Sequence, residues 1–303
     1  MDSKTLYYKS LFKDIWIASR PLSLTLALYS TTLGIVVAYM ENKLFTGNSY
    51  LDIWKIFLVT LAGLFVQTGT NFINDYFECE YKYRRQSEKK YSFLGKQRTK
   101  FDILIFLLGL GSFGATCLIG IYLIYLTTPK LLWVGLIGVI GGYSYTGEPI
   151  VYKRHGLGAI LSFVLMGPLM VYGSYLVFAE QFSWTPIILG LPLSLMIPLL
   201  MFSNELRDYE RDKSLGIRTL TVRIGYKIGK IIFLTLILSS YSLTVLYVMV
   251  GMLPISSVFV FATIPLALKS YKTVAVAKKE GVPITNKLHL TFGLITIITL
   301  LFK

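Results

Sequence analysis

Long stretches with almost no charge dominate this chain and restrict what it can fold into. Eight windows carry at most one charged residue each, and they cover residues 21–41, 56–74, 103–129, 131–147, 156–179, 181–204, 231–268 and 288–302. A helix needs about 20 mostly apolar residues to cross the hydrocarbon core of a bilayer. Only 15% of the residues are charged, whereas about 25% are charged in soluble domains. The sequence therefore predicts a polytopic membrane protein.

One of these windows is too long for a single membrane helix. The window 231–268 contains Gly251-Met252-Leu253-Pro254 near its middle, and Gly and Pro interrupt helices and favour turns. We therefore predict two helices here and nine crossings in total. The last crossing is long enough only if it begins near Pro283 and lets Lys287 reach the interface. The predicted fold is all-α, with nine transmembrane helices in a single domain, residues 1–303.

The distribution of basic residues predicts how these helices are oriented. If the N-terminus is cytoplasmic, 26 of the 30 Lys and Arg residues fall on the cytoplasmic side. The remaining four are Lys43, Lys55, Lys130 and Lys303. Cytoplasmic loops of membrane proteins carry such an excess of positive charge. The net charge of +14 thus reflects topology and attraction to anionic lipid headgroups, and no nucleic-acid partner is expected. We predict a multi-pass protein of the cell membrane.

Acidic residues gather in two clusters at the ends of predicted helices. Residues 71–80 close the second predicted helix, and residues 204–212 close the sixth, so both lie on the cytoplasmic side. Together they hold seven of the sixteen Asp and Glu residues of the chain. Acids this close to a bilayer are costly and mark functional sites. The clusters therefore predict a site for a charged ligand at the cytoplasmic face.

The spacing within each cluster indicates a metal site. Asn74 and Glu78 are four residues apart, and Asn204, Asp208 and Asp212 continue at the same step, which places each set on one side of a helix. Magnesium prefers a few carboxylates together with phosphate oxygens and water. We predict Mg²⁺ as the cofactor and four residues as its catalytic ligands, namely Asn74, Glu78, Asp208 and Asp212.

Basic and polar residues near the clusters could hold a diphosphate group, because cations offset the charge of such a group. The predicted substrate-binding residues are Arg20, Asn71, Asp75, Tyr145, Lys153, Asn204 and Arg207. The acids Glu80, Glu205 and Glu210 are interpreted as solvated or as pairing residues. The basic run 82–100 is interpreted as a loop. For each single basic residue, a role in topology or headgroup binding is the alternative.

Several of these segments resemble one known family. Residues 204–220, with N-x-x-x-D-x-x-x-D followed by Gly216 and Arg218-Thr219-Leu220, resemble the second signature of the UbiA-type intramembrane prenyltransferases. The likeness is greatest to the branch that acts on 1,4-dihydroxy-2-naphthoate. Residues 74–78, N-D-Y-F-E, are similar to the first signature of the family. Two departures leave the number of metal ions open: Glu78 replaces the usual Asp, and Lys82 replaces a further acid.

The resemblance implies a central cavity among nine transmembrane helices and an Mg²⁺-dependent enzyme. Its donor would be an isoprenyl diphosphate, and its acceptor an aromatic quinone precursor similar to 1,4-dihydroxy-2-naphthoate. Alternative acceptors are 4-hydroxybenzoate, a porphyrin-type alcohol ester and a lipid of the geranylgeranylglyceryl phosphate type. A membrane transporter is a further alternative, although it would need ionisable residues near the middle of the membrane. The sequence leaves the acceptor, the prenyl chain length and the oligomeric state open.

Overall fold

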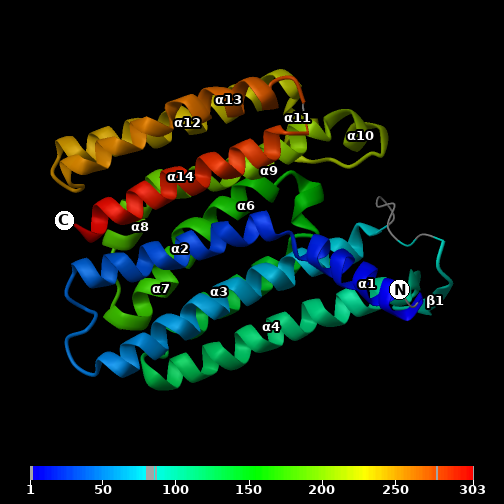
Figure 1. Cartoon of the computed structure of the whole chain (residues 1–303), viewed down its shortest axis with the longest axis horizontal. Helices are drawn as coiled ribbons and strands as arrows, with labels where there is room; N and C mark the ends of the chain where they lie inside the picture. Colours follow the sequence, from blue (N-terminus) through cyan, green and yellow to red (C-terminus); the bar gives the residue numbers. More distant parts are fainter. Residues whose placement is uncertain (1–2, 80–84, 86, 278, 303) are drawn as a thin grey trace.

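Helices that run along the long axis of the molecule make up almost the whole structure (Figure 1). The computed structural model describes residues 3–79, 85, 87–277 and 279–302. The first half of the chain contains α1 (Ser3–Ser19), α2 (Pro21–Met40), α3 (Ser49–Phe77), β1 (Lys90–Phe93), β2 (Lys96–Thr99), α4 (Lys100–Leu126) and α5 (Leu131–Ser144). The middle contains η2 (Tyr152–His155), α6 (Gly158–Val164), η3 (Leu165–Leu169), α7 (Met170–Ala179), α8 (Thr185–Ser194) and α9 (Ile197–Arg207). The remainder contains α10 (Tyr209–Ser214), α11 (Leu220–Ile224), α12 (Tyr226–Met249), η4 (Ile255–Thr263), α13 (Ile264–Val274) and α14 (Gly281–Leu301).

The helices confirm a multi-pass, all-α membrane protein, whereas the predicted number of nine crossings is not confirmed. Within the described residues, seven helices are long and apolar enough to cross a membrane: α2, α3, α4, α6 to α7, α8 to α9, α12 and α14. The two other predicted crossings correspond to α5, which has only 14 residues, and to η4 followed by α13. Nine crossings therefore stay a prediction, since only seven of the described helices have the full length of a span.

Both helix boundaries predicted near the C-terminus are confirmed. α12 ends at Met249, and the chain turns through Gly251, whose φ is 74°. Glycine adopts this left-handed conformation without a steric penalty. Pro254 then precedes η4. α14 begins at Gly281, two residues before Pro283, which gives the last helix 21 residues.

Part of the predicted loop 82–100 is instead a β-hairpin, while Lys82 lies outside the described residues. Strands β1 and β2 pair antiparallel, and Phe93 faces Lys96 across the turn. The turn residues Leu94 and Gly95 have φ values of 47° and 73°, and positive φ at both positions is the geometry of the tightest hairpin turns. A leucine at the first position gives no turn signal, so the pattern of residue types hid this hairpin.

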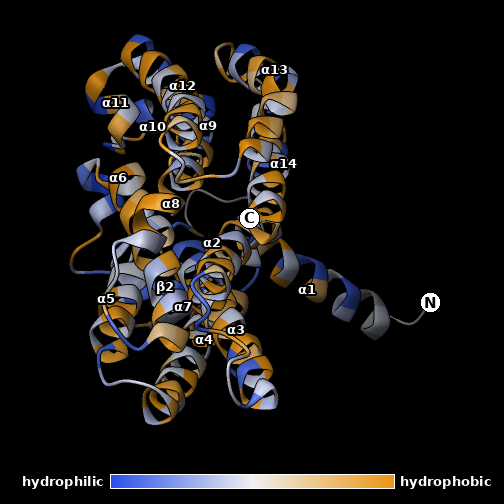
Figure 2. Ribbon diagram, turned by 90° about the vertical axis from the view of Figure 1, so that its left-hand side faces the viewer, coloured by the Kyte–Doolittle hydropathy of each residue, from blue (hydrophilic) through white to orange (hydrophobic). Residues whose placement is uncertain are grey.

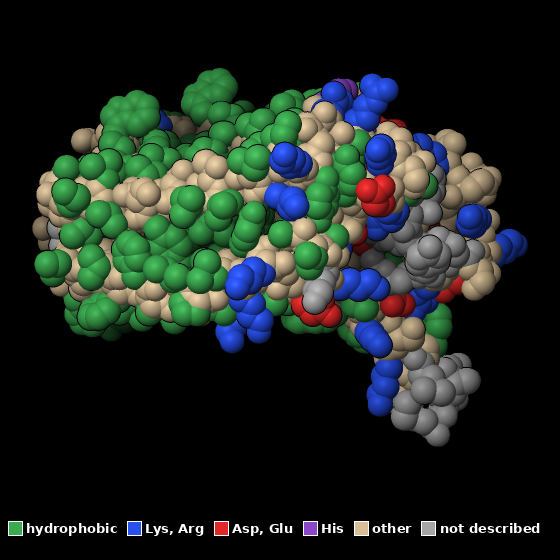
Figure 3. All heavy atoms as spheres, turned by 90° about the horizontal axis from the view of Figure 1, so that it is seen from above, with side chains coloured by type: hydrophobic (Ala, Val, Ile, Leu, Met, Phe, Trp, Pro, Cys, Tyr) green, Lys and Arg blue, Asp and Glu red, His purple; other side chains and the backbone are tan. Residues whose placement is uncertain are grey.

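Charged side chains gather at one end of the molecule. Hydrophobic side chains cover the rest of the face in Figure 3, whereas blue and red side chains lie at the end where α10, α11 and the N-terminus are found in Figure 1. Figure 2 shows apolar residues along the outer sides of the long helices and shows α1 projecting from the bundle. This is the arrangement that a bilayer favours, because lipid tails solvate apolar side chains and exclude charges.

A kink in one transmembrane helix lies beside the site described below. The segment between α6 and α7 forms a π-helical turn, and Gly167 has non-helical angles, with φ −89° and ψ −105°. Pro168 follows it and cannot donate a backbone hydrogen bond. Such turns bend helices and often occur at functional sites. The kink changes the direction of the helix between Leu165 and Met170, which both face the interior cavities.

Candidate active site

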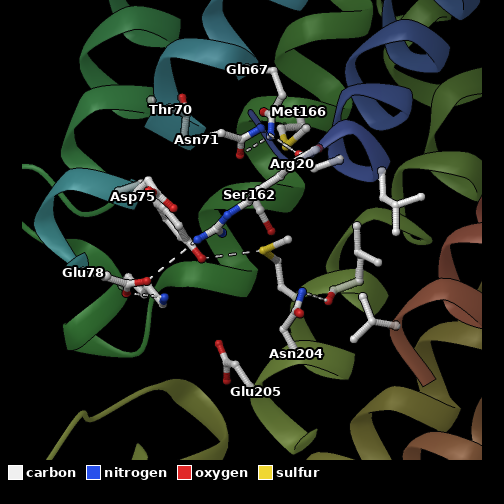
Figure 4. A pocket seen from close by; sticks show the side chains of 18 of the residues that line it. Arg20, Gln67, Thr70, Asn71, Asp75, Glu78, Ser162, Met166, Asn204 and Glu205 are labelled. Carbon is white, nitrogen blue, oxygen red and sulfur yellow. Dashed lines mark hydrogen bonds and ion pairs between the residues drawn. The ribbon is translucent and has the colours of Figure 1, made fainter. Parts of the chain in front are cut away.

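One large cavity lies at the charged end of the bundle. Its volume is about 780 Å³, and its walls come from the ends of α2, α3, α9 and α10 and from the connection between α5 and α6. Figure 4 shows side chains around it from the start of α2 and from α3, α6, η3 and α9. The cavity lining includes nearly all of the predicted site residues, namely Arg20, Asn71, Asp75, Glu78, Tyr145, Lys153, Asn204, Arg207, Asp208 and Asp212. The two acidic clusters, far apart in the sequence, therefore meet at one site.

Lys153 and Glu78 form the ion pair on one side of the cavity. α3 ends at Phe77, so Glu78 is the residue that terminates the helix, and Lys153 Nζ lies 2.5 Å from its Oε1. Lys153 lies in the short helix η2. The backbone N–H of Lys153 donates to the carbonyl of Tyr145 at 3.0 Å, which fixes its position. Burial lowers the pKa of Lys153, but the Glu78 carboxylate outweighs this effect and raises the pKa overall. Lys153 is thus a cation at neutral pH.

Arg20 reaches the same carboxylate from the junction of α1 and α2. Its φ of 50° is in the left-handed region, and Pro21 disfavours the helical conformation for the residue before it. This conformation separates the two helices. The guanidinium donates to Asn74 Oδ1, and its Nη2 lies 3.9 Å from Glu78 Oε2. A residue held in strained backbone geometry is typical of functional sites.

Asn74 is the exception among the predicted metal ligands. Its side chain is only 1% exposed, it is not part of the cavity lining, and its Oδ1 accepts the hydrogen bond from Arg20. With 3.6 residues per turn, Asn71, Asp75 and Glu78 share the stripe of α3 that faces the cavity, while Asn74 lies at its edge. In this structure Asn74 positions Arg20 and is not part of the cavity lining, so its role as a magnesium ligand stays a prediction.

Asp208 is the centre of a second charged group on the opposite wall. It lies at the junction of α9 and α10, and Arg207 donates to both of its carboxylate oxygens at 2.8 and 2.7 Å. Arg211 Nη2 lies 3.0 Å from Asp208 Oδ2 and 2.9 Å from Asp212 Oδ1. Asn204, Asp208 and Asp212 are one helical turn apart, as their spacing of four residues predicts. The N–H of Asp208 donates to the carbonyl of Asn204, and the N–H of Asp212 donates to the carbonyl of Asp208.

The two aspartates differ in their electrostatic environment. Burial raises the pKa of Asp208, but Arg207 and Arg211 outweigh it, so the pKa lies below its usual value. Burial also raises the pKa of Asp212, and Arg211 offsets this only in part, so the pKa of Asp212 lies above its usual value. Asp208 is therefore the more strongly ionised of the two.

Sequence reasoning missed two charged residues of the site. Arg211 lines the cavity. It follows Asp208 by three residues, and this spacing on a helix could have indicated that the two side chains are neighbours. Glu205, which the sequence interprets as a loop or pairing residue, does pair by accepting the N–H of Thr221 at 2.9 Å, and it is also 7% exposed and lines the cavity. Glu210 is exposed as predicted, and Glu80 lies outside the described residues.

A neutral hydrogen-bond network forms the wall deeper in the bundle. Asn71 Nδ2 donates to the carbonyl of Ser19 at 2.7 Å and to Ser23 Oγ at 2.8 Å. Gln67 Nε2 donates to Asn71 Oδ1 at 3.3 Å. Figure 4 shows Gln67, Asn71 and Arg20 close together. This network fixes α3 to the start of α2 and so determines where Arg20 lies.

The donor set fits magnesium that is bound together with a phosphorylated ligand. Within the described residues, no group of three or more His, Cys, Asp or Glu side chains lies close enough to hold a metal ion by itself. Glu78, Asp208 and Asp212 instead line one cavity from two walls. Magnesium is usually held by one or two carboxylates, with substrate phosphates and water completing its shell. The carboxylates match this pattern.

The fold and the site define a membrane enzyme whose charged centre lies at one end of a helical bundle. The profile of the UbiA prenyltransferase family matches residues 27–291. The chain belongs to this family and is a prenyltransferase, as the resemblance in the sequence predicts.

Individual relatives agree with this assignment. The 1,4-dihydroxy-2-naphthoate octaprenyltransferase of Bacillus subtilis (strain 168) is 27% identical over 244 residues, which are 79% of this chain and 74% of the relative. The 2-carboxy-1,4-naphthoquinone phytyltransferase of Synechocystis is 24% identical over 280 residues, 90% of this chain and 87% of the relative. A solved structure of a UbiA homologue from Archaeoglobus fulgidus, bound to DMAPP and Mg²⁺, has a TM-score of 0.59 at 14% identity and covers 92% of this chain and 97% of its own. This likeness shows that the two proteins share a fold.

Proposed function

We propose that this protein transfers a polyprenyl group from an isoprenyl diphosphate to an aromatic acceptor similar to 1,4-dihydroxy-2-naphthoate, with Mg²⁺ as cofactor. The observation that carries the proposal is the meeting of Glu78, Asp208 and Asp212 with four basic side chains around one cavity in a membrane bundle. The names of the Bacillus subtilis and Synechocystis relatives support a naphthalene-type acceptor. The Archaeoglobus fulgidus structure, bound to DMAPP and Mg²⁺, supports the donor and the metal.

The basic residues bind the diphosphate in this proposal. Arg20 and Lys153 approach it from one wall, and Arg207 and Arg211 approach it from the other. Guanidinium groups suit phosphate oxygens because they donate two parallel hydrogen bonds. Each of these cations now pairs with a carboxylate, so the diphosphate would enter between existing ion pairs. Magnesium bound at Glu78, Asp208 and Asp212 would neutralise the charge of the leaving diphosphate.

The chemical step breaks the allylic C–O bond of the donor. The electron pair of that bond leaves with the diphosphate, and a carbocation-like prenyl group remains. An electron-rich ring carbon of the acceptor attacks this group and forms the new C–C bond. The same carbon then loses a proton, which the released diphosphate can accept, or CO2 if it carries the carboxylate, and the electron pair of the broken bond restores the aromatic ring. Tyr145 and Tyr152, whose ring centroids are 5.5 Å apart, stand beside Lys153. Their rings can stabilise the positive charge, and the apolar surroundings exclude water that would hydrolyse the cation.

For the topology, we propose nine crossings and a cytoplasmic N-terminus. α5 extends through Tyr145 into the turn before η2, and η4 rises about 2.0 Å per residue, so η4 and α13 together are long enough to cross. In this topology the cavity opens to the cytoplasmic face of the cell membrane. The excess of basic residues at that end of the molecule supports this orientation. This is where a soluble aromatic acceptor would arrive.

Reconstitution of the reaction tests the proposal. The purified protein with geranylgeranyl diphosphate, Mg²⁺ and 1,4-dihydroxy-2-naphthoate should release diphosphate and form a prenylated naphthalene product, which mass spectrometry detects. A parallel assay with geranylgeranylglyceryl phosphate tests the lipid alternative. No turnover with any acceptor would reject the proposal, and turnover with the glycerol lipid alone would reject the aromatic acceptor.

A further inference from the structure

A second, apolar cavity continues from the active-site cavity into the bundle. It has a volume of about 310 Å³ and lies among α3, α4, α5 and α7. Four residues line both cavities, namely Val66, Gly138, Leu165 and Met170. On α3, the second cavity extends from Val66 back to Val59, which is about 10 Å at 1.5 Å per residue. It therefore leads away from the charged end.

The wall chemistry of this groove suits a hydrocarbon chain. None of the described residues that line it is charged. Its hydroxyl groups bond to their own helices: Thr31 Oγ1 donates to the carbonyl of Ala27, and Thr116 Oγ1 donates to that of Ser112. Ser174 Oγ donates to the carbonyl of Met170. These hydroxyls already have acceptors, so burying an alkyl chain against them leaves no donor unpaired.

Glycines on α4 and α5 keep the groove open. A Cβ atom added at Gly120, Gly135 or Gly138 would meet no heavy atom within 4 Å, although all three positions line the groove. Gly63 differs, because a Cβ there would come within 2.6 Å of Thr31. The first three glycines are therefore not required for helix packing. Larger side chains at these positions would extend into the space of the groove.

We propose that this groove receives the distal isoprene units of the donor, and that Gly138, Gly135 and Gly120 determine how long a prenyl chain the enzyme accepts. The inference rests on the proposed function and extends it to donor length. The continuity of the two cavities carries it, because a diphosphate among Arg20, Lys153 and Arg207 leaves its tail at the mouth of the groove. Ile121 and Leu136 are exposed on the lipid side, so the longest chains continue into the bilayer.

Matched leucine substitutions test the groove. Gly135→Leu and Gly120→Leu place an apolar side chain in it, and Gly138→Leu blocks it nearest the active site. Gly114→Leu is the control, because Gly114 lies on α4 with Gly120, also has no heavy atom within 4 Å of an added Cβ, and lines neither cavity. The readout is the ratio of kcat/KM for geranylgeranyl diphosphate to kcat/KM for dimethylallyl diphosphate.

We expect this ratio to fall by about tenfold or more in Gly135→Leu and Gly120→Leu, because a hydrophobic pocket discriminates by this factor even for a single methylene group. The control should keep the ratio of the unmodified protein. An unchanged ratio in both groove variants would overturn the inference, and loss of a copurified phospholipid in them would assign the groove to a bound lipid.

A binding measurement separates this inference from the proposed function. Thermal stabilisation by the thiodiphosphate analogues of geranylgeranyl and dimethylallyl diphosphate needs no acceptor. If the unmodified protein is stabilised by neither analogue and turns over no donor, the proposed function fails. If it is stabilised by both, and the groove variants bind the long analogue as well as the control does, only the assignment of the groove fails.

Discussion

Lys153 Nζ lies 2.5 Å from Glu78 Oε1 and so joins the connection after α5 to the end of α3. The two residues are 75 positions apart in the sequence. Both side chains are largely removed from solvent, with 17% and 16% exposed, and a partly buried pair interacts more strongly than a surface pair. In the proposed reaction this pair would open to admit the diphosphate, with Lys153 on the phosphate and Glu78 on the magnesium.

The first prediction concerns Lys153. Lys153→Met keeps the length of the side chain and removes its charge, so we expect kcat/KM for the isoprenyl diphosphate to fall roughly 10²-fold, as it does when one electrostatic donor to a leaving group is lost. Diphosphate release measures this. The neighbouring Arg154 is exposed and does not line the cavity, so Arg154→Ala should retain activity. Equal loss in both variants would indicate a general charge effect and contradict a specific role for Lys153.

The second prediction concerns Asp208 and the metal. Chelation of Mg²⁺ should stop turnover, and added Mg²⁺ should restore it. Asp208→Asn keeps the shape of the side chain but removes the charge that Arg207 and Arg211 now neutralise. We expect the half-saturating Mg²⁺ concentration to rise about tenfold or more, together with a large loss of kcat. Titration of diphosphate release with Mg²⁺ measures both. Glu210→Gln, at an exposed position outside the cavity, serves as the control and should titrate like the unmodified protein.

The sequence was sufficient for those features that depend on local pattern. The break at Gly251 and the start of α14 follow from the properties of Gly and Pro, and the clusters around Glu78 and Asp208 follow from charges placed at the ends of apolar windows. Membrane insertion makes such patterns reliable, because every charge within a span is costly. Local rules therefore located the site at one end of the bundle.

Features that depend on side-chain direction could not be predicted in the same way. Asn74 has the right spacing from Glu78, but the packing of α3 against α2 turns its side chain toward Arg20. Arg211 is one of many basic residues at that end, and its pairing with two aspartates is visible only when α9 and α10 are in place. Glu205 is buried, and its carboxylate accepts the N–H of Thr221, which lies 16 positions later in the sequence. Each of these contacts is set by tertiary structure.

The third prediction follows from the environment of Asp212. Burial raises its pKa and Arg211 lowers it, so Arg211→Gln should raise the pKa of Asp212 further. The proposed reaction needs the ionised carboxylate, and activity is therefore lost as pH falls through this pKa. We expect the acid limb of kcat/KM to move to higher pH in Arg211→Gln. An acid limb that does not move, or moves to lower pH, would show that Asp212 does not control it.

The fourth prediction separates stability from catalysis at Glu205. Its Oε2 accepts the N–H of the fully buried Thr221 at 2.9 Å and so holds the start of α11 against α9. Glu205→Ala leaves this N–H without a partner, which costs about 1–3 kcal/mol, and the melting temperature should fall by several degrees. Glu205→Gln keeps a carbonyl acceptor and should melt close to the unmodified protein. Differential scanning fluorimetry in detergent measures both, with Glu210→Ala as the exposed control.

Because the N–H of Thr221 needs only an acceptor oxygen and not a charge, equal destabilisation by Ala and Gln would show that the negative charge, and not the hydrogen bond, stabilises this junction.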